Sequence, residues 1–162
     1  MIHSKIIGVG SPFGADRAGW DAIEYLQQQT ELNSSQAIQF IALDRPGPAL
    51  IDHFRDTQQV ILIDAVKGEE KYKYKSEVDT IFEIDLNTID HSSLTTSTHG
   101  LGVIEAIDLA KALNVLPPKL NIIGIETSES DNRCISEQKL RVLLEIIEKT
   151  LVKDKPSNEV VD

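Results

Sequence analysis

Cysteine, aromatic residues and long apolar runs are all scarce in this chain of 162 residues. Cys134 is the only cysteine, which excludes an intramolecular disulfide and a thiolate metal cluster. Aromatic residues make up 5% of the chain, so aliphatic side chains must build the core. No segment approaches the roughly 18 apolar residues that a transmembrane helix requires. The sequence therefore indicates an aliphatic globular protein without a membrane span.

Positive charge is also scarce. The 16 lysines and arginines are outnumbered by 26 acidic residues, for a formal net charge of −10. Nucleic acids and anionic membranes both bind basic surfaces, so neither is an expected partner. An acidic surface is compatible with a metal cation or a basic peptide as partner, and equally with solubility alone. The start of the chain, MIHSKIIGVG, lacks the apolar core of a signal peptide, so we expect a cytoplasmic protein.

Strand and helix patterns alternate along the chain. The continuous aliphatic run VILIDAV, residues 60–66, is typical of a strand covered on both faces in a parallel sheet. We predict a three-layer α/β/α fold with a mostly parallel, twisted sheet of about five strands. The length suits one domain over residues 1–152, followed by a disordered tail at 153–162. The other predicted strands are 3–9, 37–43, 78–86 and 120–126, and the predicted helices are 16–29, 49–55, 100–113 and 136–151.

A glycine-rich turn, GVGSPFGADRAGW at residues 8–20, follows the first predicted strand. Its glycine spacing is related to the dinucleotide-binding fingerprint, and Asp44 ends the second strand where a ribose-binding acid would lie. However, Ser11, Pro12 and Phe13 separate the glycines from the helix, and Asp44 lies farther on than the usual ~20 residues. The turn could bind a dinucleotide, could be purely structural, or could present Asp16 to another ligand.

Three side chains are expected at the carboxyl edge of the sheet, where parallel sheets bind ligands. Asp16 follows the first strand, and Asp64 ends the aliphatic VILI run, where an unpaired carboxylate is costly to desolvate. His99 ends the polar stretch 87–99 and precedes a predicted helix. Each residue alone could be a helix cap, an ion-pair partner or an exposed ring. Together, two carboxylates and an imidazole form a ligand set that suits zinc, copper or nickel.

The usual hydrolase nucleophiles are not evident. Ser97 is close to His99 in the sequence, but no G-x-S-x-G elbow is present. Cys134 has only the neighbouring Arg133 as a basic activator. A metal-centred function is therefore favoured over a serine or cysteine nucleophile.

The order of these motifs resembles that of the hydrogenase maturation proteases, from Ile6 to about Leu151. The matching segments are a glycine turn, an aliphatic strand ending in Asp-Ala, a histidine that opens a helix, a strand of the form V-x-G-I and a final amphipathic helix. They read here as GVGSPFGADRAGW, VILIDAV, STHGLGVIEAIDLAKAL, NIIGIETSES and the helix that begins at Ser136-Glu137. The resemblance implies an endopeptidase that removes a C-terminal extension from the large-subunit precursor of a nickel-iron hydrogenase.

The same resemblance implies that the enzyme recognises nickel already inserted in the substrate, for which other divalent cations could substitute. The family's ligating aspartate and histidine fall on Asp64 and His99. The family's acidic pair falls on Asp16 and Arg17, so Asp16 is the expected third ligand and a cation replaces the second acid. Arg17 would weaken a nearby dication, or would pair with Asp16, Asp64 or a carboxylate of the substrate.

Two other functions stay open at the level of sequence. Because of Arg17, the chain could be a non-catalytic relative that binds a hydrogenase subunit or another metalloprotein without cutting it. It could also be the dinucleotide-binding enzyme that the glycine turn suggests.

Overall fold

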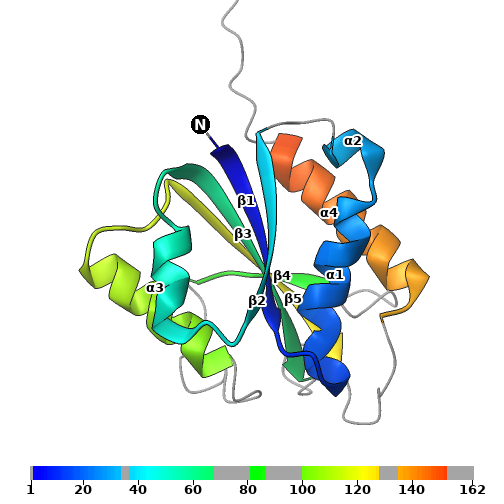
Figure 1. Ribbon diagram of the computed structural model, residues 1–162, viewed down its shortest axis with the longest axis horizontal. Helices are drawn as coiled ribbons and strands as arrows, with labels where there is room; N and C mark the ends of the chain where they lie inside the picture. The colour runs from blue at the N-terminus through cyan, green and yellow to red at the C-terminus, as the bar shows by residue number, and fades with distance from the viewer. Residues whose placement is uncertain (1, 34–36, 68–80, 87–99, 128–134, 153–162) are drawn as a thin grey trace, which may run out of the picture.

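The computed structural model describes residues 2–33, 37–67, 81–86, 100–127 and 135–152, which form one layered unit around a single sheet (Figure 1). The sheet has five strands in the order β2-β1-β3-β5-β4. Three neighbouring pairs are parallel, and β4 pairs antiparallel with β5 at one edge. The strands are β1 (Ile2–Gly10), β2 (Ile38–Asp44), β3 (Thr57–Lys67), β4 (Ile81–Ile84) and β5 (Lys119–Thr127).

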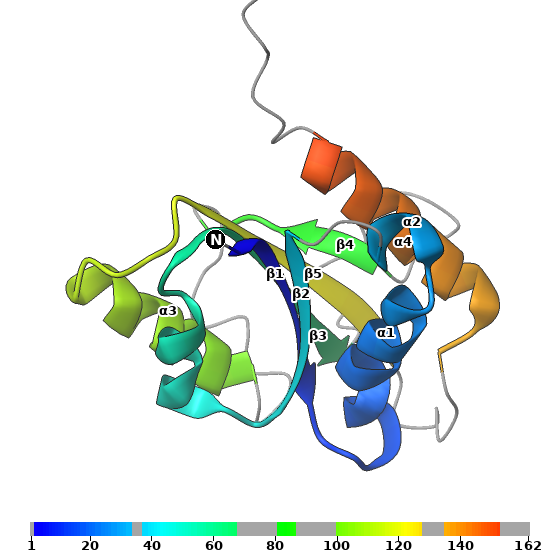
Figure 2. The same ribbon diagram turned by 45° about the horizontal axis from the view of Figure 1, so that its top comes forward.

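Helices cover both faces of this sheet. Helices α1 and α4 lie on one face, and α3 lies with the 3-10 helix η2 on the other, as Figure 2 shows. The predicted three-layer fold with a mostly parallel sheet is confirmed. The helical elements are η1 (Gly14–Arg17), α1 (Ala18–Gln27), α2 (Thr30–Asn33), η2 (Gly47–His53), α3 (Gly100–Ala112) and α4 (Glu137–Val152).

The central strand β3 explains why two cores form. Successive side chains of a strand point to opposite faces. Ile61 and Ile63 therefore pack toward α1 and α4, while Val60 and Leu62 pack toward α3 and η2, and all four are fully buried. Burial of each such side chain contributes about 1.5–3 kcal/mol. A strand buried on both faces has to be apolar without alternation, as the sequence of this strand is.

A row of polar side chains crosses the sheet toward the amino ends of its parallel strands. The Ser4 hydroxyl donates to Gln59 Oε1 at 3.2 Å, and Gln59 Nε2 donates to Asn121 Oδ1 at 3.2 Å. Asn121 Nδ2 then donates to Glu83 Oε1 at 2.9 Å. Gln59 is 2% exposed, so these hydrogen bonds satisfy a buried amide that would otherwise destabilise the fold.

Several predicted helices differ in their bounds or type. The helix predicted at 16–29 is split, because a 3-10 turn precedes α1, which begins at Ala18. The segment predicted as helix 49–55 is the 3-10 helix η2, which starts in a Pro-Gly-Pro turn where proline supplies no N–H donor. The prediction that Ser136 caps the last helix is confirmed, because α4 begins at Glu137 and the Ser136 hydroxyl accepts a hydrogen bond from the Lys139 amide at 3.3 Å.

Of the strand predicted at 78–86, residues 78–80 lie outside the described residues, and β4 (Ile81–Ile84) ends at Ile84 instead of residue 86. Within the described ranges, no helix has the length and apolarity needed to cross a membrane. The polar stretch 87–99 and the predicted tail at 153–162 lie outside the described residues. The single domain over 1–152 stays a prediction.

Candidate functional site

The glycine turn holds Asp16 against the end of β1. The Ser11 amide donates to the backbone oxygen of Asp16 at 3.1 Å, which closes the turn on itself. A Cβ at Gly10 would overlap that same carbonyl oxygen. Ser11 is buried, and its hydroxyl lies 3.5 Å from the Phe13 amide that donates to it. Glycine is therefore required at position 10, because the Asp16 carbonyl lies against it. The same close contact fixes the position of Asp16.

Two other glycines, Gly8 and Gly19, are required for a similar reason. A Cβ at Gly8 would overlap the backbone oxygen of Gly19, and a Cβ at Gly19 would overlap the backbone oxygen of Val9. Strand β1 and helix α1 thus cross in direct backbone contact. These contacts explain Gly8, Gly10 and Gly19 without a phosphate, so the dinucleotide interpretation loses its main support.

Asp64 lies within β3 and not at its end, where the sequence predicted it, because the strand continues to Lys67. It is opposite Gly124 of β5 and only 7% exposed. Burial raises the pKa of Asp64 to about 7; a hydrogen bond with the Ala65 backbone lowers the pKa in part, and the charge of Asp16 raises it further. A carboxylate in this setting is partly protonated at neutral pH, and a cation would stabilise its ionised form.

The sheet order brings Asp16 and Asp64 together. Strand β1 lies directly beside β3. Helix α1, which follows β1, and helix α3, which follows β3 and β4 along the chain, cover opposite faces of the sheet. This is the switch point of a parallel α/β sheet, where ligands bind. Two of the three predicted site residues therefore meet at one edge of the sheet.

His99, the third predicted residue, lies outside the described residues. It directly precedes α3, and Gly102 in the first turn of that helix lies close to Gly47, just beyond β2. Figure 1 shows that α3 begins at the edge where β1, β2 and β3 end. Among the described residues, no three His, Cys, Asp or Glu side chains gather as a metal site. A role for His99 as the third ligand stays a prediction.

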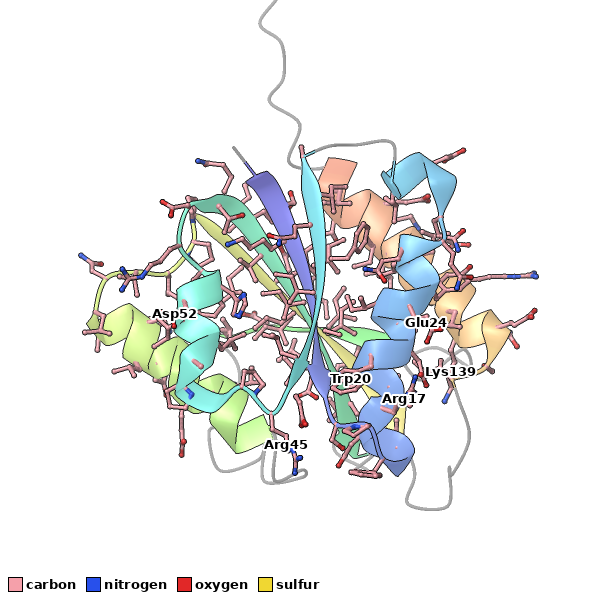
Figure 3. The ribbon with its side chains drawn as sticks, in the orientation of Figure 1. Arg17, Trp20, Glu24, Arg45, Asp52 and Lys139 are labelled. Carbon is pink, nitrogen blue, oxygen red and sulfur yellow. The ribbon has the colours of Figure 1, made fainter. Side chains whose placement is uncertain are left out.

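Arg17 contacts acidic residues farther along α1. Its Nε donates to Asp21 Oδ1 at 2.8 Å, and its Nη2 lies 3.7 Å from Glu24 Oε2. Figure 3 shows Arg17 and Glu24 together on the α1 side of the molecule. These contacts draw the guanidinium along the helix. From the sequence, Asp16, Asp64 or a substrate carboxylate was the expected ion-pair partner of Arg17. Asp21 and Glu24 were not foreseen.

Asp44 and Arg45 are at the same edge; Asp44 was predicted to end the second strand, whereas Arg45 was not foreseen. Asp44 is in register with Gly10 of β1, so the two strands end side by side. Arg45 follows in a left-handed conformation, with φ 43°, and binds the Asp44 carboxylate at 2.7 Å through Nε. The left-handed backbone depends on contacts with β1, which no local pattern encodes.

Trp20 anchors α1 under this edge. Its indole Nε1 donates to the backbone oxygen of Leu43 in β2 at 3.0 Å. Its Cδ1 lies 3.6 Å from the position of a Cβ at Gly10. One tryptophan thus links the glycine turn, α1 and the end of β2.

The strand order and the paired carboxylates define a three-layer α/β protein with an acidic site at the switch point. This fold is that of the hydrogenase maturation endopeptidases. HybD from Escherichia coli, a hydrogenase maturating endopeptidase, superposes with a TM-score of 0.69 at 18% identity over 93% of each chain. The [NiFe] hydrogenase maturation protease HybD from Thermococcus kodakarensis gives 0.62 at 19% identity, covering 91% of this chain and 98% of that one.

A hydrogenase 2 maturation peptidase from a Thaumarchaeota archaeon has a TM-score of 0.57 at 19% identity, over 92% of this chain and 97% of that one. No protein-family model matches the chain, and no curated protein matches it in sequence. At these identities the likeness is one of fold, and it extends over nearly the whole chain.

Proposed function

We propose that this protein is a cytoplasmic endopeptidase that removes a C-terminal extension from the nickel-loaded large-subunit precursor of a nickel-iron hydrogenase. The observation that carries the proposal is the meeting of Asp16 and Asp64 at the switch point of a fold shared with hydrogenase maturation endopeptidases. The motif order in the sequence, including His99 directly before α3, supports the same function.

In this proposal nickel arrives as part of the substrate. Asp16, Asp64 and His99 bind it, and other divalent cations can take its place. The burial of Asp64 supports such a role, because a dication compensates the cost of an ionised carboxylate in an apolar setting. Held by these residues, the metal would position the precursor and would supply Lewis-acid polarisation of the scissile carbonyl. Cleavage then requires no serine or cysteine nucleophile from the protein.

The test is to incubate nickel-loaded precursor with the protein and to measure the intact mass of the precursor. We expect loss of a C-terminal peptide with the wild-type protein. His99→Ala and Asp64→Asn should abolish this loss while circular dichroism shows an intact fold. His53→Ala is the matched control, because the His53 carbonyl binds Lys5 Nζ on β1, away from the carboxyl edge. Undiminished cleavage by His99→Ala would count against the proposal.

The same experiment separates the two other functions. A non-catalytic binding protein would hold the precursor without any loss of mass. Arg17 motivated that alternative, and its contacts with Asp21 and Glu24 weaken the reason for it. A dinucleotide enzyme would be stabilised against heat by NAD. We expect no such stabilisation, because backbone atoms of β1 and α1 occupy the space next to the glycines of the turn.

A further inference from the structure

Arg45 is held in an unusual backbone conformation at the carboxyl edge of the sheet. Its φ is 43°, in the left-handed region, where a residue with a side chain is strained relative to glycine. The Arg45 amide donates to the backbone oxygen of Gly10 at 3.0 Å, so β1 holds this conformation in place. Strained residues that are fixed in this way concentrate at functional sites.

The Arg45 side chain is oriented by the residue before it. Its Nε lies 2.7 Å and its Nη2 lies 3.4 Å from the two carboxylate oxygens of Asp44. The side chain is still 54% exposed. A guanidinium has five N–H donors, and these two contacts with Asp44 use one each from Nε and Nη2. The fork is therefore fixed in direction while part of it faces solvent.

Arg45 also lies within the electrostatic reach of the candidate site. The hydrogen bond and the charge of Asp44 raise the pKa of Arg45, and the charge of Asp16 adds to this increase. Figure 3 shows Arg45 at the edge where β2 ends, on the far side of the glycine turn from Arg17. It is a permanently charged cation beside acids that would otherwise repel an anionic group.

The local structure alone does not explain an arginine here. An exposed ion pair between sequence neighbours contributes little to stability, and this does not exceed the cost of the left-handed backbone. Glycine would satisfy the turn with less strain. A ligand that binds the guanidinium would therefore explain better why an arginine occupies this position.

We propose that Arg45 is a specificity residue that binds a carboxylate of the precursor's C-terminal extension. The inference rests on the proposed function, because an extension that is to be removed carries a terminal carboxylate and can carry acidic side chains. An arginine fork matches a carboxylate in shape and charge. Arg45 would orient the extension while the metal ligands hold the nickel.

The test compares Arg45→Gly with Arg45→Lys and the wild-type protein. Arg45→Gly removes the fork and relieves the backbone, so its melting temperature should equal or exceed that of the wild type. Its KM for the nickel-loaded precursor should rise roughly 10- to 100-fold, the range expected for a lost charged hydrogen bond, with kcat less affected. Arg45→Lys should recover only part of the loss. Asn114→Gly, at an exposed residue with φ 60°, is the control for relief of backbone strain and should keep the wild-type KM.

The precursor is varied in parallel. One form has its extension's Asp and Glu residues changed to Asn and Gln, and a semisynthetic form has an amidated C-terminus. With the precursor form that lacks the recognised carboxylate, the KM of the wild type should rise. The wild type and Arg45→Gly should then have the same KM. An equal KM for wild type and Arg45→Gly with the unmodified precursor would overturn the inference. So would a difference that persists in both modified forms.

Binding of the precursor, measured by calorimetry, separates this inference from the proposed function. If the wild type binds the precursor but does not cleave it, and Arg45→Gly binds more weakly, the protease function fails and the role of Arg45 stands. If the wild type cleaves and Arg45→Gly has the same affinity and KM, only the role of Arg45 fails. If the wild type neither binds nor cleaves, both are wrong.

Discussion

The charge of Asp16 raises the pKa of Asp64, although one residue lies in a short helix after β1 and the other lies within β3. Two carboxylates influence each other in this way only when they are close in space. Their proximity follows from the order of the sheet, in which β1 and β3 are neighbours. The same proximity is unfavourable for two anions alone and favourable around a dication.

Asp64→Asn should make the apo protein more stable at neutral and alkaline pH. The pKa of Asp64 is about 7 in the folded state and about 4 in an unfolded chain. Between these values the folded state binds more protons than the unfolded state. Stability contributed by protonated Asp64 is therefore complete below pH ~4 and is lost as the pH rises to about 7. The difference between these two pKa values corresponds to a free energy on the order of 4 kcal/mol.

Urea unfolding at pH 5, 7 and 8 measures this effect. The advantage of Asp64→Asn over wild type should be largest at pH 8 and smaller at pH 5. Asp52→Asn, at an exposed carboxyl of η2, is the control and should follow the wild-type pH profile. A lower stability of Asp64→Asn at pH 8 would contradict the cost of burying the ionised Asp64 carboxylate.

Gly10→Ala should disrupt the site as well as the fold. Its Cβ would overlap the Asp16 carbonyl oxygen, so the turn must move and Asp16 must move with it. Overpacking of this kind costs typically about 1–3 kcal/mol. We expect a lower melting temperature and impaired processing of the precursor.

Gly102→Ala is the matched control for that substitution. The nearest atom to its Cβ, the Cα of Gly47, is at 3.6 Å, an ordinary contact. Alanine in a helix is favoured over glycine by roughly 0.5–1 kcal/mol, so stability should be unchanged or higher. Equal effects of the two substitutions would mean that Gly10 is not constrained by the turn.

Arg17→Gln should have little effect on stability and should not prevent processing. Arg17 pairs with Asp21 and Glu24 on the helix surface, and its side chain is 42% exposed. Such pairs contribute about 0–1 kcal/mol. Arg141→Gln, which removes a similar helix-surface pair with Glu137, gives the comparison. A change of more than tenfold in the processing rate of Arg17→Gln alone would place Arg17 in the site after all.

Gln59→Leu should destabilise the protein without changing the chemistry of the site. The substitution leaves the Ser4 hydroxyl and the Asn121 carbonyl without the amide that links them. Loss of a partner in a buried polar row costs about 1–3 kcal/mol. Chemical denaturation should show this loss, while kcat for processing stays at the wild-type value below the melting temperature. A drop in kcat would mean that the polar row at the amino ends of the strands is coupled to the site at their carboxyl ends, which the contacts do not explain.

The parts of the structure that follow from local pattern were predictable from the sequence. The continuous VILIDAV run identified β3 as a strand buried on both faces, and Asp64 was recognised because a carboxylate interrupts it. The parallel layered fold followed from the alternation of strands and helices. The four-residue helix α2 was missed because a single turn is too short to show a helical period.

What depended on contacts between distant segments was not predictable. The glycines of the turn left a dinucleotide site, a structural turn and a ligand-presenting turn open, and only the crossing of β1 and α1 shows that Gly8 and Gly19 touch backbone atoms. Asp16 and Asp64 were considered as ion-pair partners of Arg17. Arg17 instead lies on the surface of α1, because that helix begins at Ala18. The left-handed Arg45 depends on a hydrogen bond to Gly10 and has no signature in the sequence.

The position of Trp20 has a practical consequence. It is the only tryptophan of the chain, and its indole bridges α1 to the end of β2 beside Gly10. Intrinsic fluorescence excited at the tryptophan band therefore originates at a single place, next to the acidic edge. Without any added label, the emission of this protein reports whether the glycine turn is docked and responds when an ion or a polypeptide arrives there.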